Sequence, residues 1–388
     1  MTASGPPRRL GSVDRVSGSA GPTSAPSTAV PSRSQTTPTT GSPTDSSASA
    51  PARPRLVSLD VTRGLAVAAM LAVNNEGINP GHPGWLRHPE WNGFSVADVV
   101  FPLFLFCIGV SSALSSRQLP SADGPSFGAA FSAMAKRCLI LFALGVGLSA
   151  LKQHELVLAG VLQHIAVTSL LAWFVLLLPR RAQYAVGTGL LVAGAAIGLA
   201  WGFADGHTVD QAIDRFLYDR ETAEGLPVAV ISVFNVLAGA WAGRWFATGD
   251  RSRIIRSLVA WTTVPLVIGL ALTPWIPLNK RLWTPTYALV GAAAAAAISL
   301  FVYWLVDLQG VQRPVQWLRE LGANPLAVYV ACSALAAVVP DAWRIDVVQW
   351  MTGPLPIAVA SVAWSAIWIA LAWVIADQLW RRHVLIKL

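Results

Sequence analysis

The chain has 388 residues, of which 54% are hydrophobic and only 12% are charged. In an ordinary soluble domain about a quarter of the residues are charged, so the composition excludes that class and predicts a polytopic membrane protein. The formal net charge of +8 could attract nucleic acid, but the Lys and Arg residues lie in short clusters between apolar runs. That arrangement is the positive-inside pattern of membrane proteins, so we expect no nucleic-acid partner.

The first segment, residues 1–54, is rich in Ser, Thr, Pro, Gly and Ala and has few large aliphatic side chains. A segment of this composition cannot bury enough apolar surface to offset the entropy lost on ordering. We therefore predict a disordered cytoplasmic tail over 1–54 and a transmembrane domain over 55–388.

Ten apolar runs follow, each close to the roughly 20 residues that a helix needs to cross the hydrocarbon core. They cover approximately 57–76, 95–115, 130–151, 156–178, 183–203, 226–247, 253–274, 284–306, 322–340 and 356–379. Lipid offers no partner to the backbone, and the runs lack the alternation of a barrel, so we predict an all-α bundle of about ten transmembrane helices.

The loops on the same side of the membrane as the N-terminus carry most of the Lys and Arg residues. This bias places that side, and with it both termini, in the cytoplasm. We expect a multi-pass protein of the cell (plasma or inner) membrane. The loop around His88 and the acidic loop 204–225 then lie outside. The sequence leaves a monomer and a homodimer equally open.

Polar residues form a stripe along the first predicted helix. At 100° per residue, Asp60, Arg63 and Asn74 share one face, with about 21 Å between the two ends of the stripe. Asp60 and Arg63 can form a structural ion pair at the membrane edge. Alternatively, Arg63 helps to hold an anionic cosubstrate that enters from the cytoplasm.

The loop after that helix carries His88, Trp91 and Asn92, and Asp98 stands at the start of the second helix. A histidine in a surface loop is unremarkable alone. Its neighbours, however, include a carboxylate and amides that could fix its tautomer, as acid–base chemistry requires. Ionisable groups at a bilayer boundary are costly, so the cluster indicates catalysis or transport.

The fourth predicted helix carries Gln163 and His164, which could line an internal cavity together with the stripe of the first helix. Hydrogen-bonded helix packing is the alternative interpretation. The three cysteines, Cys107, Cys138 and Cys332, lie in apolar segments and lack the spacing of metal ligands. We expect buried, inert thiols and no metal.

The chain resembles the heparan-alpha-glucosaminide N-acetyltransferase family of membrane acyltransferases over about residues 55–340. The motifs that carry the resemblance are SLDVTRG (58–64), NNEG (74–77), LRHPEWNG (86–93), ADVVFPLF (97–104), GVLQH (160–164), GAWAGR (239–244), LNKRLWT (278–284) and NPLAVY (324–329). The stretch from Asp60 to Pro102 is the most specific. Two departures are His164, where the family usually has Arg, and the 204–225 loop, which has no recognisable family pattern.

The resemblance implies an enzyme that transfers an acetyl group from cytoplasmic acetyl-CoA, its cosubstrate, to an amino sugar or envelope glycan on the extracytoplasmic side. The catalytic residues expected from it are His88 and Asn74, with Asp98 in support. The residues expected to contact acyl-CoA or substrate are Asp60, Arg63, Trp91, Asn92, Gln163, His164, Lys280 and Asn324. The sequence leaves N- and O-acylation open, as well as direct transfer and an acetyl-histidine intermediate.

A transporter or flippase of a polar envelope precursor, using the same polar stripes as a path, is the alternative function.

Overall fold

The computed structural model describes residues 56–75, 77, 81, 83–115, 119–120, 124–222 and 224–386. The predicted tail over 1–54 lies outside these residues. Over the described ranges the chain is helical and contains no strand, which confirms the predicted all-α class. The α-helices are α1 (Val57–Asn74), α2 (Val100–Leu114), α3 (Phe127–Gln153), α4 (Val161–Leu176), α5 (Arg180–Trp201), α6 (Val209–Tyr218), α7 (Leu226–Gly243), α8 (Arg251–Ala271), α9 (Pro285–Tyr303), α10 (Gln316–Ala323), α11 (Pro325–Val338), α12 (Asp341–Met351) and α13 (Ile357–Arg381).

Eight helices of the described chain are long and apolar enough to cross a membrane, or nine if a bent pair counts as one span. Eight of the ten predicted runs correspond to these helices. The run predicted over 156–178 is shorter, because α4 begins only at Val161 and has 16 residues. The run predicted over 322–340 is broken, since α10 and α11 meet at a bend of 78°.

The bend lies at Asn324, directly before Pro325. Proline lacks the backbone N–H that would continue the helix, and its ring disfavours helical backbone angles in the preceding residue. Asn324 accordingly has φ −132° and ψ 54°. Two short helices of the loops, α6 and α12, were not predicted.

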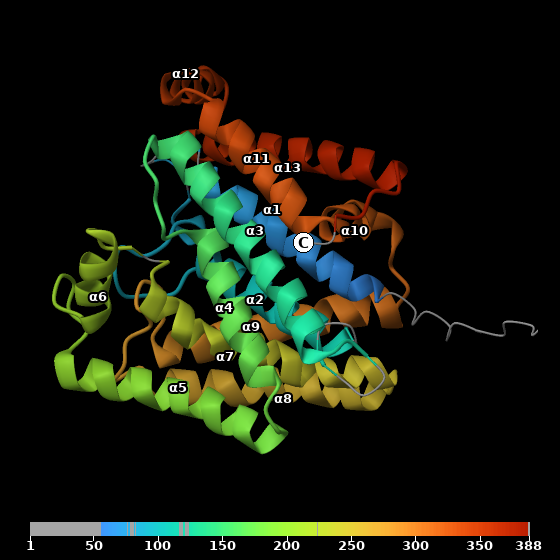
Figure 1. The fold of residues 1–388 in the computed structure, drawn as a ribbon. Coiled ribbons are helices and arrows are strands. Elements are labelled where there is room, and N and C mark those ends of the chain that lie inside the picture. Colours follow the sequence, from blue (N-terminus) through green and yellow to red (C-terminus); the bar gives the residue numbers. More distant parts are fainter. Residues whose placement is uncertain are drawn as a thin grey trace, which may run out of the picture. The chain divides into compact units, whose positions relative to one another are not determined.

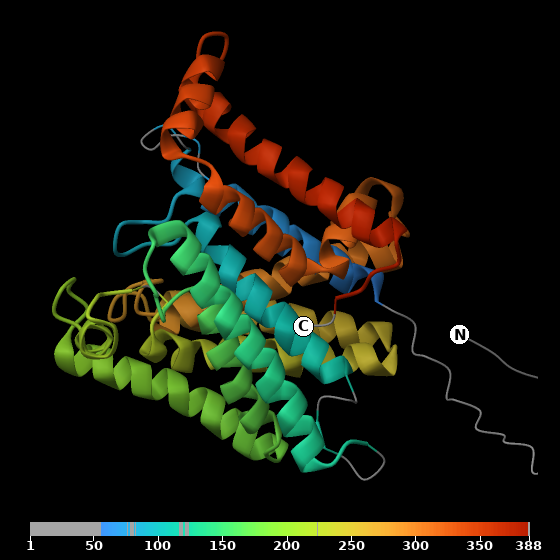
Figure 2. The ribbon, with the colours of Figure 1, turned by 45° about the horizontal axis from the view of Figure 1, so that its top comes forward.

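Helix α1 lies inside the bundle and packs against α2, α9, α10, α11 and α13 (Figure 1). Helices α5 and α13 form opposite sides of the bundle in both ribbon views (Figure 2). This position of α1 explains why its polar side chains face protein rather than lipid.

Glycines bring the central helices into backbone contact. A Cβ atom on Gly109 of α2 would lie 1.9 Å from the Val236 carbonyl oxygen of α7. A Cβ atom on Gly239 of α7 would lie 2.0 Å from the Phe106 carbonyl oxygen of α2. A Cβ atom on Gly64 of α1 would lie 1.8 Å from a carbonyl oxygen of α10, and one on Gly322 of α10 would lie 1.7 Å from a carbonyl oxygen of α1. Small residues allow such close packing, which is a main source of helix association in membranes.

Candidate active site

The predicted histidine forms the centre of a polar cluster at the end of the bundle where α1 finishes. His88 Nδ1 lies 2.7 Å from Asp98 Oδ1, and Lys280 Nζ lies 2.9 Å from His88 Nε2. Asp98 is fully buried, whereas the His88 side chain is 35% exposed. The imidazole is thus held between a carboxylate at Nδ1 and an ammonium at Nε2, while part of the ring stays exposed.

A short 3₁₀ helix, η2 (Val96–Val99), positions the carboxylate. Asp98 Oδ2 accepts hydrogen bonds from the Ser95 backbone N–H at 2.8 Å and the Ser95 hydroxyl at 3.2 Å. The Tyr287 hydroxyl of α9 donates to the Asp98 carbonyl oxygen at 2.8 Å. Both carboxylate oxygens therefore have fixed partners, and Oδ1 is directed at the imidazole.

The turn before α9 supplies Lys280. Within it, the Thr284 N–H donates to the Asn279 carbonyl and the Trp283 N–H to the Lys280 carbonyl, both at 3.1 Å. Trp283 has φ +47°, which is unusual for a bulky residue. Its buried indole donates to Asn235 Oδ1 at 2.9 Å, and this bond helps to hold the strained turn.

Contacts on both sides anchor the His88 loop. Asn279 Nδ2 donates to Asn92 Oδ1 at 3.1 Å, and the Gly93 N–H donates to the Leu278 carbonyl at 2.8 Å. The Trp91 indole donates to the Phe203 carbonyl at 2.7 Å. Trp91 and Asn92, expected to contact substrate, thus hold the loop in place in this structure.

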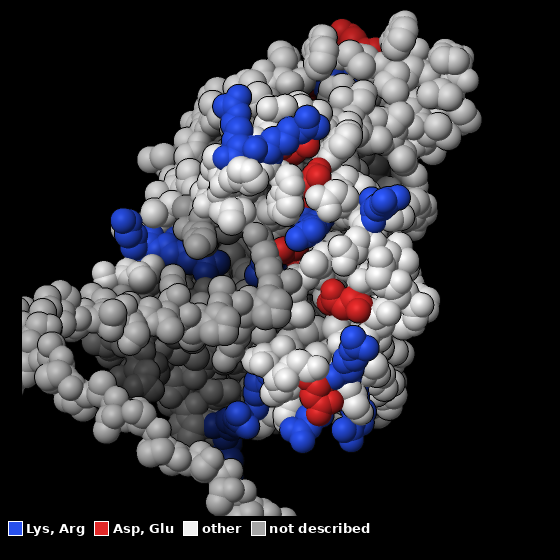
Figure 3. All heavy atoms as spheres, turned by 90° about the vertical axis from the view of Figure 1, so that its right-hand side faces the viewer, with Lys and Arg blue, Asp and Glu red and all other residues white. Residues whose placement is uncertain are grey.

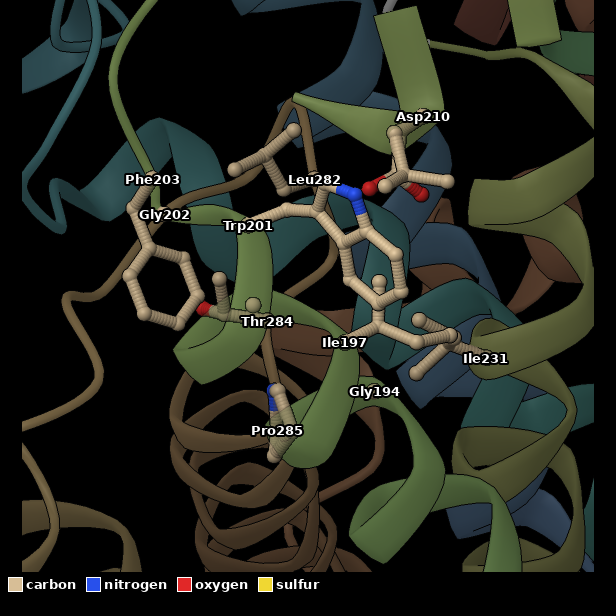
Figure 4. A pocket seen from close by; sticks show the side chains of 12 residues that line it. Gly194, Ile197, Trp201, Gly202, Phe203, Asp210, Ile231, Leu282, Thr284 and Pro285 are labelled. Carbon is tan, nitrogen blue, oxygen red and sulfur yellow. The ribbon is translucent and has the colours of Figure 1, made fainter. Parts of the chain in front are cut away.

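A small crevice of ≈ 40 Å³ lies beside Phe203, whose carbonyl accepts the hydrogen bond of Trp91. It is formed by the end of α5, α7 and the start of α9, with Trp201, Phe203 and Pro285 in its wall (Figure 4). Asp210 of α6 is at its edge, where burial raises the pKa of the carboxyl group. The volume fits one or two water molecules rather than a substrate.

A larger cavity of ≈ 480 Å³ opens where α1 ends. Asn74 and Gln163 line it, and so do Glu224 and Tyr329. The Tyr329 hydroxyl hydrogen-bonds to the Asn74 side chain, and Gln163 Nε2 donates to the Val157 carbonyl at 3.0 Å. Of the residues expected to line a cavity, Asn74 and Gln163 lie in the wall of this one.

The cavity and the His88 cluster influence each other through charge. Lys280 is half-buried, and burial lowers the pKa of its ammonium group, as does Arg281, whereas the charges of Glu224 and Asp98 raise it. Glu224 lines the cavity. A carboxylate at the cavity wall therefore acts on the lysine that contacts the imidazole.

The other end of the α1 stripe is a separate polar cluster. Arg63 Nη1 donates to Asp60 Oδ1 at 3.2 Å, and Nη2 donates to the Ser111 hydroxyl of α2. The lining of the ≈ 480 Å³ cavity contains Asn74 but neither Arg63 nor His88. The continuous polar path expected between the two ends stays a prediction.

Two predicted contact residues lie in structural networks. His164 is buried between the rings of Phe101 and Trp283, and its Nε2 lies 2.8 Å from the Ser232 hydroxyl of α7. Its position corresponds to the packing alternative. Asn324 donates to the Val384 carbonyl at 2.9 Å and accepts from the Ile386 N–H at 2.7 Å, so it anchors the chain after α13.

The sequence reasoning did not select Tyr329, Glu224 or Ser95. Tyr329 ends the NPLAVY motif, which could have indicated it. Glu224 lies in an acidic loop without periodicity, and only the fold shows that it faces the cavity.

Comparisons with known proteins give the family. Residues 55–273 match the family model described as "Heparan-alpha-glucosaminide N-acetyltransferase, catalytic". Two curated relatives bear the name heparan-alpha-glucosaminide N-acetyltransferase. The human protein is 24% identical over 86% of this chain and 60% of its own length, and the mouse protein is 24% identical over 83% and 59%. The chain thus spans about 60% of the length of these relatives.

Proposed function

Because the chain belongs to the heparan-alpha-glucosaminide N-acetyltransferase family, we propose that it is a membrane N-acetyltransferase. It moves an acetyl group from cytoplasmic acetyl-CoA to the amine of an amino sugar or envelope glycan on the extracytoplasmic side. The observation that carries the proposal is the His88 imidazole held between buried Asp98 and Lys280, the lysine on which the charge of the cavity residue Glu224 acts.

His88 is the reactive group in this proposal. Asp98 accepts a hydrogen bond from the Nδ1–H, which fixes the tautomer that has its lone pair on Nε2. That lone pair serves either to take a proton from the acceptor amine or to carry the acetyl group transiently. General-base assistance contributes about 10²–10⁴-fold in rate, so the loss of the imidazole costs a factor of that order.

The ≈ 480 Å³ cavity is the place we assign to the acceptor and the thioester. Its wall combines amides, hydroxyls and carboxylates, including Asn74, Gln163, Ser333 and Glu221. Such groups can bind the hydroxyls and the amine of a sugar. We assign Asn74 the role of orienting the reacting groups.

The opposite end of α1 is the proposed binding region for the CoA phosphates. Figure 3 shows this end of the molecule, where α1 begins, with several groups of Lys and Arg on its surface. Arg63 is close enough to Arg137 for its charge to act on that guanidinium, and within the described residues Arg137 Nε has no hydrogen-bond partner. Two neighbouring cations favour a bound anion. Lys136 and Arg244 are further candidates.

The test measures transfer of labelled acetyl from acetyl-CoA to glucosamine by the purified protein. We expect His88→Ala to lose at least 100-fold in rate and to keep its thermal stabilisation by CoA. His207→Ala, in an exposed loop, is the matched control. Undiminished turnover in His88→Ala would refute the assignment.

The same measurements separate the enzyme from the transporter alternative. CoA at a hundredfold its Kd stabilises a protein that binds it by about 2.7 kcal/mol. A transporter of an envelope precursor gains no such stabilisation and forms no acetylated sugar.

A further inference from the structure

The nitrogen of His88 that the proposed reaction needs is already in contact with a cation. Lys280 Nζ lies 2.9 Å from Nε2. A lysine ammonium has three donors and no acceptor, so Nε2 must accept this hydrogen bond. The Nδ1–H then donates to Asp98 at 2.7 Å. Both ring nitrogens are thus satisfied, and the lone pair is available only after the ammonium moves.

The backbone of Lys280 is fixed, so only its side chain can move. The Lys280 carbonyl accepts from the Trp283 N–H, and the preceding Asn279 is fully buried. Asn279 Oδ1 also accepts from the Leu282 N–H at 3.0 Å. A rigid turn therefore holds a flexible four-carbon chain with its ammonium beside Nε2.

We propose that Lys280 donates the hydrogen bond that stabilises the oxygen of the acyl group during transfer. This inference rests on the proposed function. A carbonyl carbon that approaches Nε2 brings its oxygen within about 3 Å of a donor placed there, which is the arrangement of an acyl-transfer site. A hydrogen bond to a developing oxyanion is stronger than one to neutral imidazole. The ammonium is thereby drawn from Nε2 to the oxygen, and the lone pair becomes free.

The role is the same in both routes of transfer. In direct transfer the acceptor amine forms a bond to the carbonyl carbon and the C=O electron pair moves to oxygen; the pair returns as the C–S bond breaks, and the proton that Nε2 takes from the amine leaves with CoA as its thiol. In the two-step route Nε2 forms the first bond, and CoA leaves as a thiolate when the electron pair returns. The acceptor amine then adds to the acetyl carbon, the C–Nε2 bond breaks as the pair returns a second time, and the proton that the amine loses balances the thiolate. Lys280 keeps its protons throughout.

Asn74 is the other expected catalytic residue that could donate to the acyl oxygen, but Lys280 is the better placed of the two. The Asn74 amide hydrogen-bonds to Tyr329 in the cavity, whereas Lys280 contacts Nε2 itself. Lys280 reaches His88 from 192 residues away along the chain.

The decisive variant is Lys280→Cys. The native cysteines, Cys107, Cys138 and Cys332, are buried, so thiol reagents act on the new residue. An aminoethyl methanethiosulfonate restores an ammonium with N–H donors, and its trimethylammonium analogue restores the charge without them. Arg281→Cys, at the exposed neighbouring position, is the control for both reagents.

We expect Lys280→Cys to lose about 10²–10³-fold in kcat, with stabilisation by CoA unchanged. The aminoethyl reagent should raise the kcat of Lys280→Cys at least tenfold, and the trimethylammonium reagent should leave it unchanged. Equal rescue by both reagents, or a loss below threefold, would overturn the proposal.

A second readout does not depend on acetyl transfer. Diethyl pyrocarbonate offers Nε2 a reactive carbonyl, and mass spectrometry of peptides gives the modification rate of His88 relative to exposed His154. We expect His88 to react roughly tenfold more slowly in Lys280→Cys than in the wild-type protein. An equal or faster rate contradicts the donor role. Absence of acetyl transfer by the wild-type protein contradicts the proposed function instead.

Discussion

Replacing Asp98 by asparagine removes one negative charge from the site and preserves the shape of the side chain. Asp98 accepts from Ser95 through Oδ2 and from His88 through Oδ1, and it is fully buried. An amide has only one acceptor oxygen. If that oxygen faces Ser95, the NH₂ group faces Nδ1 and forces the ring proton onto Nε2. If the oxygen faces His88, two buried donors meet at Ser95.

Either arrangement loses one hydrogen bond to a charged group, which contributes about 1.5–3 kcal/mol. At 1.36 kcal/mol per factor of ten, the rate of acetyl transfer should fall roughly 10- to 150-fold. Steady-state kinetics with labelled acetyl-CoA measure kcat, and thermal unfolding with and without CoA shows that the variant is folded.

Ser95→Ala is the matched control, because it removes only the 3.2 Å contact and leaves the backbone hydrogen bond to Asp98. We expect it to stay within about threefold of the wild-type rate. If Asp98→Asn also stays within threefold, Asp98 does not set the His88 tautomer and the reasoning fails.

Three further predictions concern other parts of the molecule. Arg63→Gln should raise the KM for acetyl-CoA about tenfold and leave kcat within twofold, because the proposed phosphate contact is equally strong in the ground state and the transition state. An unchanged KM would show that Arg63 does not bind the CoA phosphates. Burial, together with the charges of Asp210, Glu221 and Glu224, raises the pKa of Asp214 from 3.8 to about 6. The folded state therefore binds this proton more tightly than the unfolded state, and the resulting stability is complete below about pH 4 and lost as the pH rises through 6. Asp214→Asn should flatten the pH dependence of thermal unfolding between pH 4 and 7 and stabilise the protein at pH 7.5 by up to about 3 kcal/mol; a pH dependence equal to that of the wild type contradicts this. Gly239→Ala should destabilise the protein by about 3 kcal/mol, because its Cβ would lie 2.0 Å from the Phe106 carbonyl oxygen. Gly189→Ala, with open space around the position, should leave the melting temperature unchanged or raise it.

The helices were predictable where an apolar run continues for about 20 residues without interruption. The run predicted over 226–247, for example, corresponds to Leu226–Thr248. Pro325 broke the run predicted over 322–340, because apolar composition does not register a missing N–H. Helix α6 was missed because it is short and alternates apolar with charged residues instead of forming a continuous apolar run, although Thr208 and Gln211 form a capping box at its start.

The site was predictable only in its local part. His88 and Asp98 are ten residues apart, so their proximity could be expected from the loop alone. The motif over 278–284 led to Lys280 as an expected contact residue, but its contact with Nε2 joins segments from opposite halves of the chain, and neither segment indicates that contact. For His164, the sequence could not distinguish a cavity wall from helix packing, because both place a polar side chain on an inward face.

The central claim is that this protein transfers an acetyl group from acetyl-CoA on one side of the membrane to an acceptor on the other, and that the transfer depends on His88. The most direct measurement uses sealed vesicles containing the protein, with labelled acetyl-CoA inside only and glucosamine outside only. Molecules of either orientation can be present, because only those with the CoA-binding end inside contribute. The account predicts acetylated glucosamine outside with the wild-type protein and at least 100-fold less with His88→Ala. Product formed only when both substrates share one side, or equally by both proteins, would contradict it.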